Sequence, residues 1–277
     1  MLTSTAQGDE SSGRHDGPLA DWEVPLTASR PGRHIAQLYT EHEFLARAVS
    51  RFVGDGLARG EGMLVIASPL HWRLVSRRLE TLGLDVQSFQ RDAQLRVRDA
   101  ASMLETFMVD GRPRREPFRA VIGAELDALR ASGHARARTF GEMVDLLRRG
   151  DLESAVELET LWTELVTERR ISLLCGYSVD ALDPRSYRGL VQKVAANHSD
   201  LIPVEDYARL ERAVERAYVE VFGSRRDAKA LREAFLQHFS PPAAMPEAEA
   251  AILALQTFVP GSADQLISSA RRHYHAA

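Results

Sequence analysis

Residues 60–86, GEGMLVIASPLHWRLVSRRLETLGLDV, decide the fold class. Met63–Ala67 is a continuous apolar run, which is typical of a strand buried on both faces of a parallel sheet. Ser68 and Pro69 then predict the start of a helix, because serine caps helices well and proline fits the first helical turn. Gly83 marks where this helix is expected to end. The stretch therefore predicts a buried strand followed by a helix, which is one unit of an α/β fold.

The same alternation continues on both sides of this unit. Strands are predicted at Arg33–Tyr39, Met63–Ala67, Leu95–Val97, Arg136–Phe140 and Ile171–Tyr177. Helices are predicted between them, from Thr40 (with Glu43 in a capping box) to Gly60, from Pro69 to Leu82, and at Ala100–Val109, Phe118–Ala131, Glu142–Arg149, Leu152–Arg169 and Tyr187–Ala196. This order favours an α/β fold with a mainly parallel sheet and helices on both faces.

Composition divides the chain into three parts. Residues 1–30 are rich in Ser, Gly, Asp and Pro and predict a disordered leader. Residues 31–203 hold the α/β domain, and residues 204–277 hold no strand candidate. Four helices are predicted in this last part, at Tyr207–Phe222, Ala228–Phe239, Glu247–Phe258 and Ala263–His273. This small all-helical region is expected either to dock a signalling partner or a second copy, or to pack as an extension of the core.

Charge and cysteine content exclude several classes of protein. A net charge of −4 argues against a nucleic-acid binder, which needs a basic surface. The single cysteine, Cys175, allows no intramolecular disulfide and predicts no cysteine-based zinc site. The sequence shows neither a signal peptide nor a membrane span, so we expect a cytoplasmic protein without membrane contact.

A RecA-like ATPase would need a phosphate-binding loop after the buried strand. Such a loop supplies glycines, backbone N–H groups and a lysine for the phosphates. The residues that follow the strand, SPLHWR at 68–73, contain neither glycine nor lysine. Pro69 also removes one N–H group. We therefore expect no working ATPase and no bound cofactor.

Several segments resemble a known family. They are the opening stretch, RTFGEMVDLLRRGDLESAVELETLWTEL at 138–165, ISLLCGYSVD at 171–180 and NHSDLIP at 197–203. Together they resemble the MEDS domain, the methanogen/methylotroph sensory domain, which is related to the KaiC and RecA ATPases. The resemblance covers about 34–203 and implies a degenerate RecA/KaiC-like fold that receives a small-ligand signal, with hydrocarbon-like ligands suggested for the family. Residues 204–277 show neither the kinase module nor the helix-turn-helix that such domains usually carry.

Glu159 is the strongest candidate for a ligand-binding residue. In the helix predicted at Leu152–Arg169 it is the only charge inside a broad apolar face. A buried carboxylate must be paired, hydrogen-bonded or protonated. Glu159 is thus either a ligand-binding or signal-coupling acid, or the structural partner of an arginine such as Arg138.

Four more residues are predicted to line a crevice at the strand ends, where open α/β sheets bind ligands. Glu142 follows a strand directly, although an acid in the first turn also stabilises a helix. His71 lies where a phosphate loop would be, as a ligand contact or pH sensor, or as a locally bonded histidine. Asp99 and Tyr177 end strands, and their inclusion rests on position alone.

Other chemistry-bearing residues favour structural roles. His34, Cys175 and His198 are interpreted as core residues, and no two of these histidines have metal-ligand spacing, so no metal site is predicted. The runs Arg112–Arg115 and Arg225–Arg226 are interpreted as solvated charge, with docking of an acidic partner as the other reading.

Three functions compete on this basis. The first is a non-catalytic sensory or regulatory protein that binds a small organic ligand at the strand-end crevice and signals through its helical tail or a partner. The second is a protein-interaction scaffold for a signalling or transcription partner. The third is a residual nucleotide-binding enzyme that uses Glu142 or Glu159 as a base.

Overall fold

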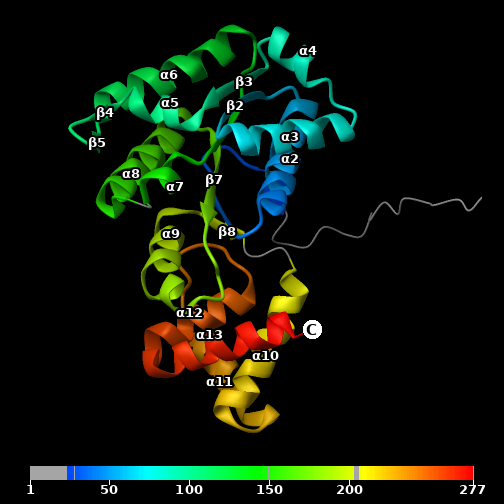
Figure 1. Ribbon diagram of the computed structural model, residues 1–277, viewed down its shortest axis with the longest axis vertical. Coiled ribbons are helices and arrows are strands. Elements are labelled where there is room, and N and C mark those ends of the chain that lie inside the picture. The colour runs from blue at the N-terminus through cyan, green and yellow to red at the C-terminus, as the bar shows by residue number, and fades with distance from the viewer. Residues whose placement is uncertain (1–23, 28, 149, 203–205, 277) are drawn as a thin grey trace, which may run out of the picture.

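A parallel sheet forms the centre of the computed structural model, which describes residues 24–27, 29–148, 150–202 and 206–276 (Figure 1). Within these residues the sheet has six strands in the order β3-β2-β6-β7-β1-β8, and every pairing is parallel. The strands are β1 His34–Tyr39, β2 Gly62–Ala67, β3 Leu95–Asp99, β6 Ala137–Gly141, β7 Ser172–Ser178 and β8 Asp200–Ile202. The predicted α/β fold with a parallel sheet is confirmed.

Helices cover both faces of the sheet, as Figure 1 shows. One face carries α2 His42–Ala58, α3 Pro69–Thr81 and α4 Val86–Arg91. The other carries α5 Ala100–Glu105, α6 Arg115–Ala131, α7 Met143–Arg148, α8 Leu152–Arg169 and α9 Val191–Asn197. Neighbouring strand residues alternate between the two apolar clusters: Val65 packs with α2 and α3, whereas Leu64 packs on the opposite side. This three-layer arrangement is the α/β architecture that the sequence predicts, with helices on both faces of a parallel sheet.

The helix starts that position the site follow local sequence. The Ser68 hydroxyl accepts a hydrogen bond from the His71 N–H and caps α3 as predicted. Asp151 caps α8 through the N–H groups of Glu153 and Ser154. The capping box predicted at Thr40 is wrong, because α2 begins after Glu41 without a side-chain cap.

Several short elements are not predicted from the sequence. The helix predicted at Ala100–Val109 ends at Glu105. Met108–Val109, the last two residues of the prediction, instead form strand β4, which pairs in a hairpin with β5 Arg112–Pro113. Asp110 and Gly111 join these strands, both with positive φ. This Asp-Gly pair is a strong signal for a two-residue hairpin turn. Neither α4 nor β8 was predicted, since each is too short to show a clear apolar period.

The leader prediction is wrong at its C-terminal end. Residues 24–27 form α1 Val24–Thr27, and Leu26 is buried against α2. The Arg138 guanidinium donates to the Leu26 carbonyl at 3.2 Å, which ties this helix to the core. The rest of the predicted leader, residues 1–23, lies outside the described residues.

The C-terminal helices pack at the β8 edge of the sheet (Figure 1). They are α10 Tyr207–Phe222, α11 Arg225–His238, α12 Glu247–Phe258 and α13 Pro260–His275. One apolar cluster runs from the α8 face of the sheet into α10, α12 and α13. Beside β8, the Leu201 N–H donates to the Ala244 carbonyl at 2.8 Å, so the segment before α12 extends the sheet edge. The C-terminal helices are therefore joined to the α/β core by both apolar packing and backbone hydrogen bonds.

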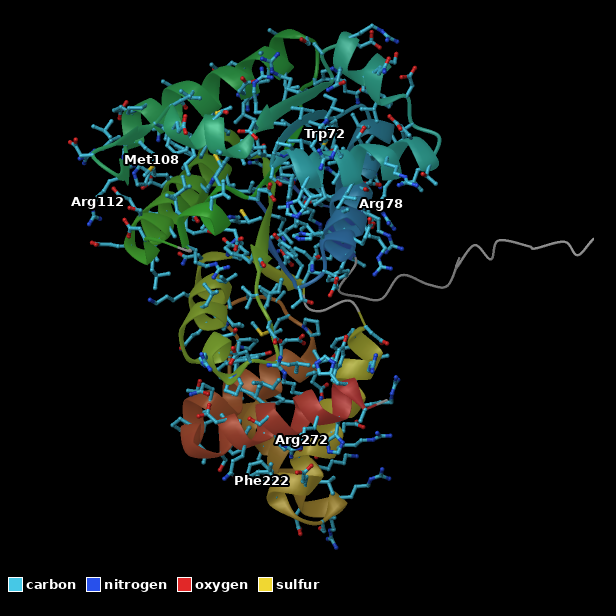
Figure 2. The ribbon with its side chains drawn as sticks, in the orientation of Figure 1. Trp72, Arg78, Met108, Arg112, Phe222 and Arg272 are labelled. Carbon is cyan, nitrogen blue, oxygen red and sulfur yellow. The ribbon has the colours of Figure 1, made fainter. Side chains whose placement is uncertain are left out.

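A single turn of π-helix between β7 and α9 contacts these helices. This turn, η2 Ser186–Leu190, precedes α9 directly and lies against α12. Figure 2 shows the two ends of the molecule, with Met108 and Arg112 in the hairpin and Phe222 and Arg272 in the C-terminal helices. No helix of the described residues is both long and apolar enough to cross a membrane.

Candidate functional site

Glu142 and His71 meet at the carboxyl ends of β6 and β2, as the sequence predicts. The Glu142 carboxylate accepts hydrogen bonds from the Ser68 backbone N–H and from the His71 ring at Nδ1. The other His71 ring nitrogen, Nε2, lies 2.8 Å from Nδ1 of His42. Glu142 and His71 are buried, whereas His42 is exposed. This strand-end site therefore links a buried acid to the surface through two imidazole rings.

The hydrogen-bond network fixes the direction of this chain. A carboxylate only accepts, so His71 carries its proton on Nδ1 when Glu142 is ionised. In neutral His71 the Nε2 atom is then an acceptor, and the hydrogen bond comes from His42 Nδ1–H. The Tyr39 ring meets His71 edge-on at 5.7 Å between ring centroids. Every polar atom of the Glu142–His71 pair thus has a partner within the protein.

The strand-end site lies where a phosphate loop would begin. In a RecA-like ATPase the first N–H groups of the helix after this strand face the phosphates. Here the Ser68 N–H is bonded to the Glu142 carboxylate, whose charge repels a phosphate. The backbone N–H group at the start of α3 is thus already hydrogen-bonded to an acid of the same chain.

Asp99 and Tyr177 have other surroundings. The Asp99 carboxylate caps α5 through the N–H (2.8 Å) and hydroxyl (2.9 Å) of Ser102. These hydrogen bonds lower the pKa of Asp99. Tyr177 is buried on the α8 face of β7, and its hydroxyl lies 3.4 Å from Nε2 of His198. Tyr177 therefore belongs with Glu159.

Four buried side chains from four parts of the chain converge around Glu159. We call them the core cluster: His34, Glu159, Cys175 and His198. His34 Nε2 lies 3.4 Å from Cys175 Sγ and 3.5 Å from Glu159 Oε2. His198 Nε2 lies 3.8 Å from the same Glu159 oxygen. One ligand atom from each residue lies within 4.8 Å of all the others.

The outer nitrogens of both histidines are bonded to the surrounding structure. His198 Nδ1 lies 2.7 Å from the Val194 carbonyl, which can only accept, so this nitrogen carries the proton. His34 Nδ1 lies 3.2 Å from the Thr163 hydroxyl. Both rings therefore present Nε2 to the centre of the cluster.

Burial dominates the electrostatics of the core cluster. It raises the pKa of Glu159 to about 8 and lowers the pKa of His198 to about 4. Burial, followed by the neighbouring His198, lowers the pKa of His34 well below its usual range. Burial and then Glu159 raise the pKa of the Cys175 thiol. Without a bound cation, the protonated acid and neutral rings are thus favoured at neutral pH.

Glu159 is buried in an apolar arc, as predicted. The prediction that an arginine such as Arg138 is its structural partner is wrong. Arg138 instead bonds Glu61 and, at 2.7 Å, Asp55. Neither Glu159 oxygen has a hydrogen-bond partner among the residues that the structure describes. The sequence could not indicate the histidine neighbours, because positions 34, 159, 175 and 198 have no local spacing in common.

A small pocket leads from the surface to Glu159 and Tyr177. It lies between α7, α8 and α9, and its free space of about 20 Å³ holds one water molecule. The exposed side chains Leu152, Val156 and Lys193 lie at its outer end. Its remaining lining residues are Val144, Arg148, Ala155, Leu190, Val194 and Asn197. This α8–α9 pocket is thus mainly apolar, with one acid and one phenol at its inner end.

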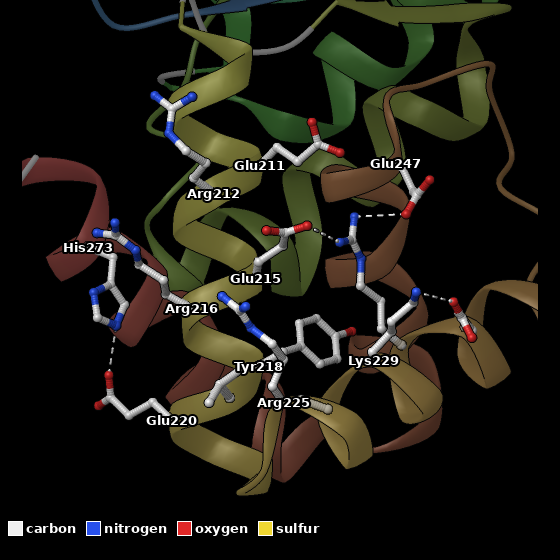
Figure 3. A pocket seen from close by; sticks show the side chains of 14 residues that line it. Glu211, Arg212, Glu215, Arg216, Tyr218, Glu220, Arg225, Lys229, Glu247 and His273 are labelled. Atoms are coloured by element: carbon white, nitrogen blue, oxygen red, sulfur yellow. Dashed lines mark hydrogen bonds and ion pairs between the residues drawn. The ribbon is translucent and has the colours of Figure 1, made fainter.

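A larger groove of about 940 Å³ runs beside α10 and α11 (Figure 3). Arg232 spans it and lies 2.9 Å from Glu247 and 3.8 Å from Glu215. By contrast, Arg212, Arg216 and Arg225 line the groove and form no ion pair with any described residue. Within the first arginine run, Arg112 and Arg115 contact Glu153 and Glu164 of α8. Of the two runs, only the second contributes to this groove, through Arg225.

The comparisons with known proteins find one family. The model described as "MEDS: MEthanogen/methylotroph, DcmR Sensory domain" matches residues 33–199, which include the strand-end site and the core cluster. A crystal structure of a KaiC-like protein from the hyperthermophilic archaeon Pyrococcus horikoshii OT3 is similar at 14% identity and a TM-score of 0.37. That match covers 54% of this chain and 64% of the other, less than two thirds of its length, and carries no further argument. Curated protein sequences give no match.

Proposed function

The chain belongs to the MEDS family of sensory domains, and from this premise we propose that it is a non-catalytic sensor that binds a small ligand in the α8–α9 pocket. The family assignment points to a sensory or regulatory role. The observation that supports this binding place is a pocket that connects the surface to two buried polar groups, Glu159 and Tyr177. These are two of the five ligand-binding residues that the sequence analysis singles out.

The lining of the pocket defines the ligand class. Most of its wall residues are valine, leucine and alanine, beside Arg148, Lys193 and Asn197, so most of the ligand is expected to be apolar. The inner end offers a protonated carboxyl at Glu159 and the Tyr177 hydroxyl, which together donate and accept hydrogen bonds. A small aliphatic molecule with one hydroxyl or amine fits this chemistry.

The small size of the pocket couples binding to movement. Its free space holds only one water molecule, so an organic ligand must displace a wall. The α9 wall is continuous with the π-helical turn η2, which lies against α12. Turns of π-helix occur frequently at functional sites. A ligand that moves α9 would therefore shift the contact between η2 and α12.

The strand-end site supports the non-catalytic part of the proposal. Its acid and histidine are bonded to each other, and the N–H group that a phosphate would need is taken by Glu142. Magnesium-dependent nucleotide turnover by the purified protein, lost in Glu142→Gln, would overturn this part. It would favour the residual nucleotide-binding enzyme.

A thermal-shift panel of short aliphatic alcohols and amines tests the binding place. A ligand that binds only the folded state raises the melting temperature. Val156→Trp puts a large ring at the exposed mouth of the pocket and is expected to abolish the shift. Thr167→Trp adds the same ring to an exposed position of α8 away from the pocket and is the matched control. A shift that survives in Val156→Trp would contradict the proposal.

Hydrogen exchange tests the signalling step. With a shifting ligand bound, we expect altered protection in both α9 and α12. A change confined to α9 would contradict coupling to the C-terminal helices. If no compound in the panel shifts the melting temperature, the interaction scaffold gains support. Its docking surface would be the α10–α11 groove, where Arg212, Arg216 and Arg225 are available to an acidic partner segment.

A further inference from the structure

The core cluster has the composition of a transition-metal site. It combines two imidazoles, one thiol and one carboxyl, all buried and drawn from β1, α8, β7 and the turn after α9. Imidazole and thiolate are ligands that zinc prefers, whereas Mg²⁺ and Ca²⁺ prefer oxygen alone. No metal site is predicted from the sequence, because these ligands have no local spacing in common and come together only in the fold.

The distances within the cluster fit four ligands around one ion. Zinc bonds of about 2.0 to 2.3 Å give edges of about 3.3 to 3.8 Å between the ligand atoms of a tetrahedron. The three contacts that share His34 Nε2 or Glu159 Oε2 measure 3.4, 3.5 and 3.8 Å. Three of the six edges of a coordination tetrahedron are therefore already close to the required length, and the other three are no longer than 4.8 Å. Only small side-chain movements would close the remaining edges.

The outer hydrogen bonds of the histidines provide a second, independent observation. A histidine that binds a metal usually gives its other ring N–H to a carbonyl, carboxylate or water. His198 gives its Nδ1–H to the Val194 carbonyl at 2.7 Å, and His34 Nδ1 lies 3.2 Å from the Thr163 hydroxyl. His198 thus aims its Nε2 lone pair at the cluster, and His34 does the same in the tautomer that carries its proton on Nδ1. The Tyr177 hydroxyl, 3.4 Å from His198 Nε2, is a weak competitor.

The charge balance also favours a divalent cation. Glu159 is buried with neither oxygen hydrogen-bonded among the described residues, which is costly for a carboxylate. Zinc binding releases the protons of the Cys175 thiol and the Glu159 carboxyl to solvent, and the resulting thiolate and carboxylate carry two negative charges that one Zn²⁺ cancels. A zinc-loaded cluster would thus be neutral in the core and would satisfy the carboxylate.

We propose that His34, Glu159, Cys175 and His198 bind one Zn²⁺ ion in a four-coordinate site. The ion joins β1 and β7 of the sheet to α8 and to the turn between α9 and β8. Four protein ligands characterise a structural zinc site. This proposal does not depend on the proposed ligand function. With zinc bound, Glu159 is a carboxylate that only accepts hydrogen bonds, and the Tyr177 hydroxyl is the donor at the inner end of the pocket.

Metal content measures the site directly. The full chain is stripped with a chelator, reloaded with zinc, desalted and analysed by inductively coupled plasma mass spectrometry. We expect one zinc per chain. Cys175→Ser, His198→Gln and Glu159→Gln should each lower zinc affinity more than about tenfold, since even outer partners of metal ligands change affinity by about that factor.

Glu249→Gln is the matched control for Glu159→Gln. Glu249 is also a fully buried acid without a hydrogen bond from another described residue, but it is not part of the cluster. It should keep one zinc per chain. Val156→Trp should also keep the zinc while it blocks the pocket, which separates failure of this proposal from failure of the ligand function.

Cobalt substitution on the wild-type chain keeps the test independent of variant folding. Co²⁺ in the site should show the visible absorption of tetrahedral coordination and a near-ultraviolet thiolate charge-transfer band. Six-coordinate cobalt without that band would overturn the proposal. So would a zinc content well below one per chain after reloading, or one that the three ligand substitutions leave unchanged.

Discussion

Glu142 and Glu159 are equally buried acids, with relative exposures of 4% and 5%, yet they differ in every other respect. Glu142 accepts hydrogen bonds from Ser68 and His71. Glu159 lies near two histidines and a thiol but has no hydrogen bond to any described residue. Burial alone therefore does not identify a functional acid. What separates the two is whether the fold already provides the partners that the charge needs.

The comparison also explains why the two sites have different roles in our proposals. At the strand-end site the chain completes its own network, and nothing remains for a ligand to satisfy. At the core cluster, four potential ligand atoms face one another, and neither Glu159 oxygen has a hydrogen bond to a described residue. A cation that arrives there supplies the missing partner. The incomplete site is thus the one expected to bind.

The largest expected effect comes from making the same substitution in both acids. Glu142→Met leaves the Ser68 N–H and the His71 ring buried without an acceptor, and should cost about 3 kcal/mol. That loss corresponds to a melting temperature about 6 to 12 °C lower. Glu159→Met in the zinc-free protein should be neutral or stabilising, because it replaces an unpaired buried acid by an apolar side chain of similar length.

Urea unfolding of both variants at pH 7, after chelator treatment, measures this difference. Comparable losses of stability in the two variants would break the comparison. They would show that Glu159 has a hydrogen-bonded partner in the folded protein.

The sequence predicts the residues of the strand-end site more completely than those of the core cluster. Glu142 and His71 follow directly from strand ends and a helix start, which are local features. The burial of Glu159 follows from helical periodicity, which is also local. Its partners His34, Cys175 and His198 come from strands β1 and β7 and from the turn before β8, and only the strand order β7-β1-β8 makes them neighbours. That order depends on tertiary packing, which a single sequence does not display.

The fold shows the same division. The apolar strands and the capped helix at Ser68 were predicted because each has its own pattern. The short strand β8 was missed, since three residues carry no period and its pairing with β1 is set by distant parts of the chain. The hairpin at Asp110-Gly111 was missed despite a local turn signal, because the apolar residues before it continue a helical pattern.

Zinc removal should have the next largest effect and act through only one of the two acids. An ion that binds the folded state alone stabilises it by about 2.7 kcal/mol at a free concentration of 100 Kd. Unfolding of the wild-type protein should therefore shift on zinc addition, and the shift should disappear in Cys175→Ser. Glu142→Met should show the full stabilisation by zinc, although its stability without zinc is lower than that of the wild type. A zinc shift that survives in Cys175→Ser would place the ion elsewhere.

A third buried acid sharpens the comparison through pH. Burial raises the pKa of Glu249 to about 8, above its usual 4.5, so the folded protein holds a proton that the unfolded chain releases. Stability should therefore fall as the pH rises from about 4.5 to 8 and level off above it. Glu249→Gln removes this contribution, worth of the order of 1 kcal/mol per pH unit. Unfolding of wild type and variant at pH 5 to 8 measures it. Parallel profiles would contradict the raised pKa.

The smallest effect is expected at the surface end of the strand-end site. His42 is exposed and donates to His71 Nε2, and in its absence water takes its place. His42→Gln should therefore change stability by no more than about 0.5 kcal/mol, whereas Glu142→Met costs several times as much. A loss above about 2 kcal/mol would show that the outer imidazole is required to hold the pair. The strand-end site would then be as dependent on an added partner as the core cluster, and the contrast between the two acids would no longer stand.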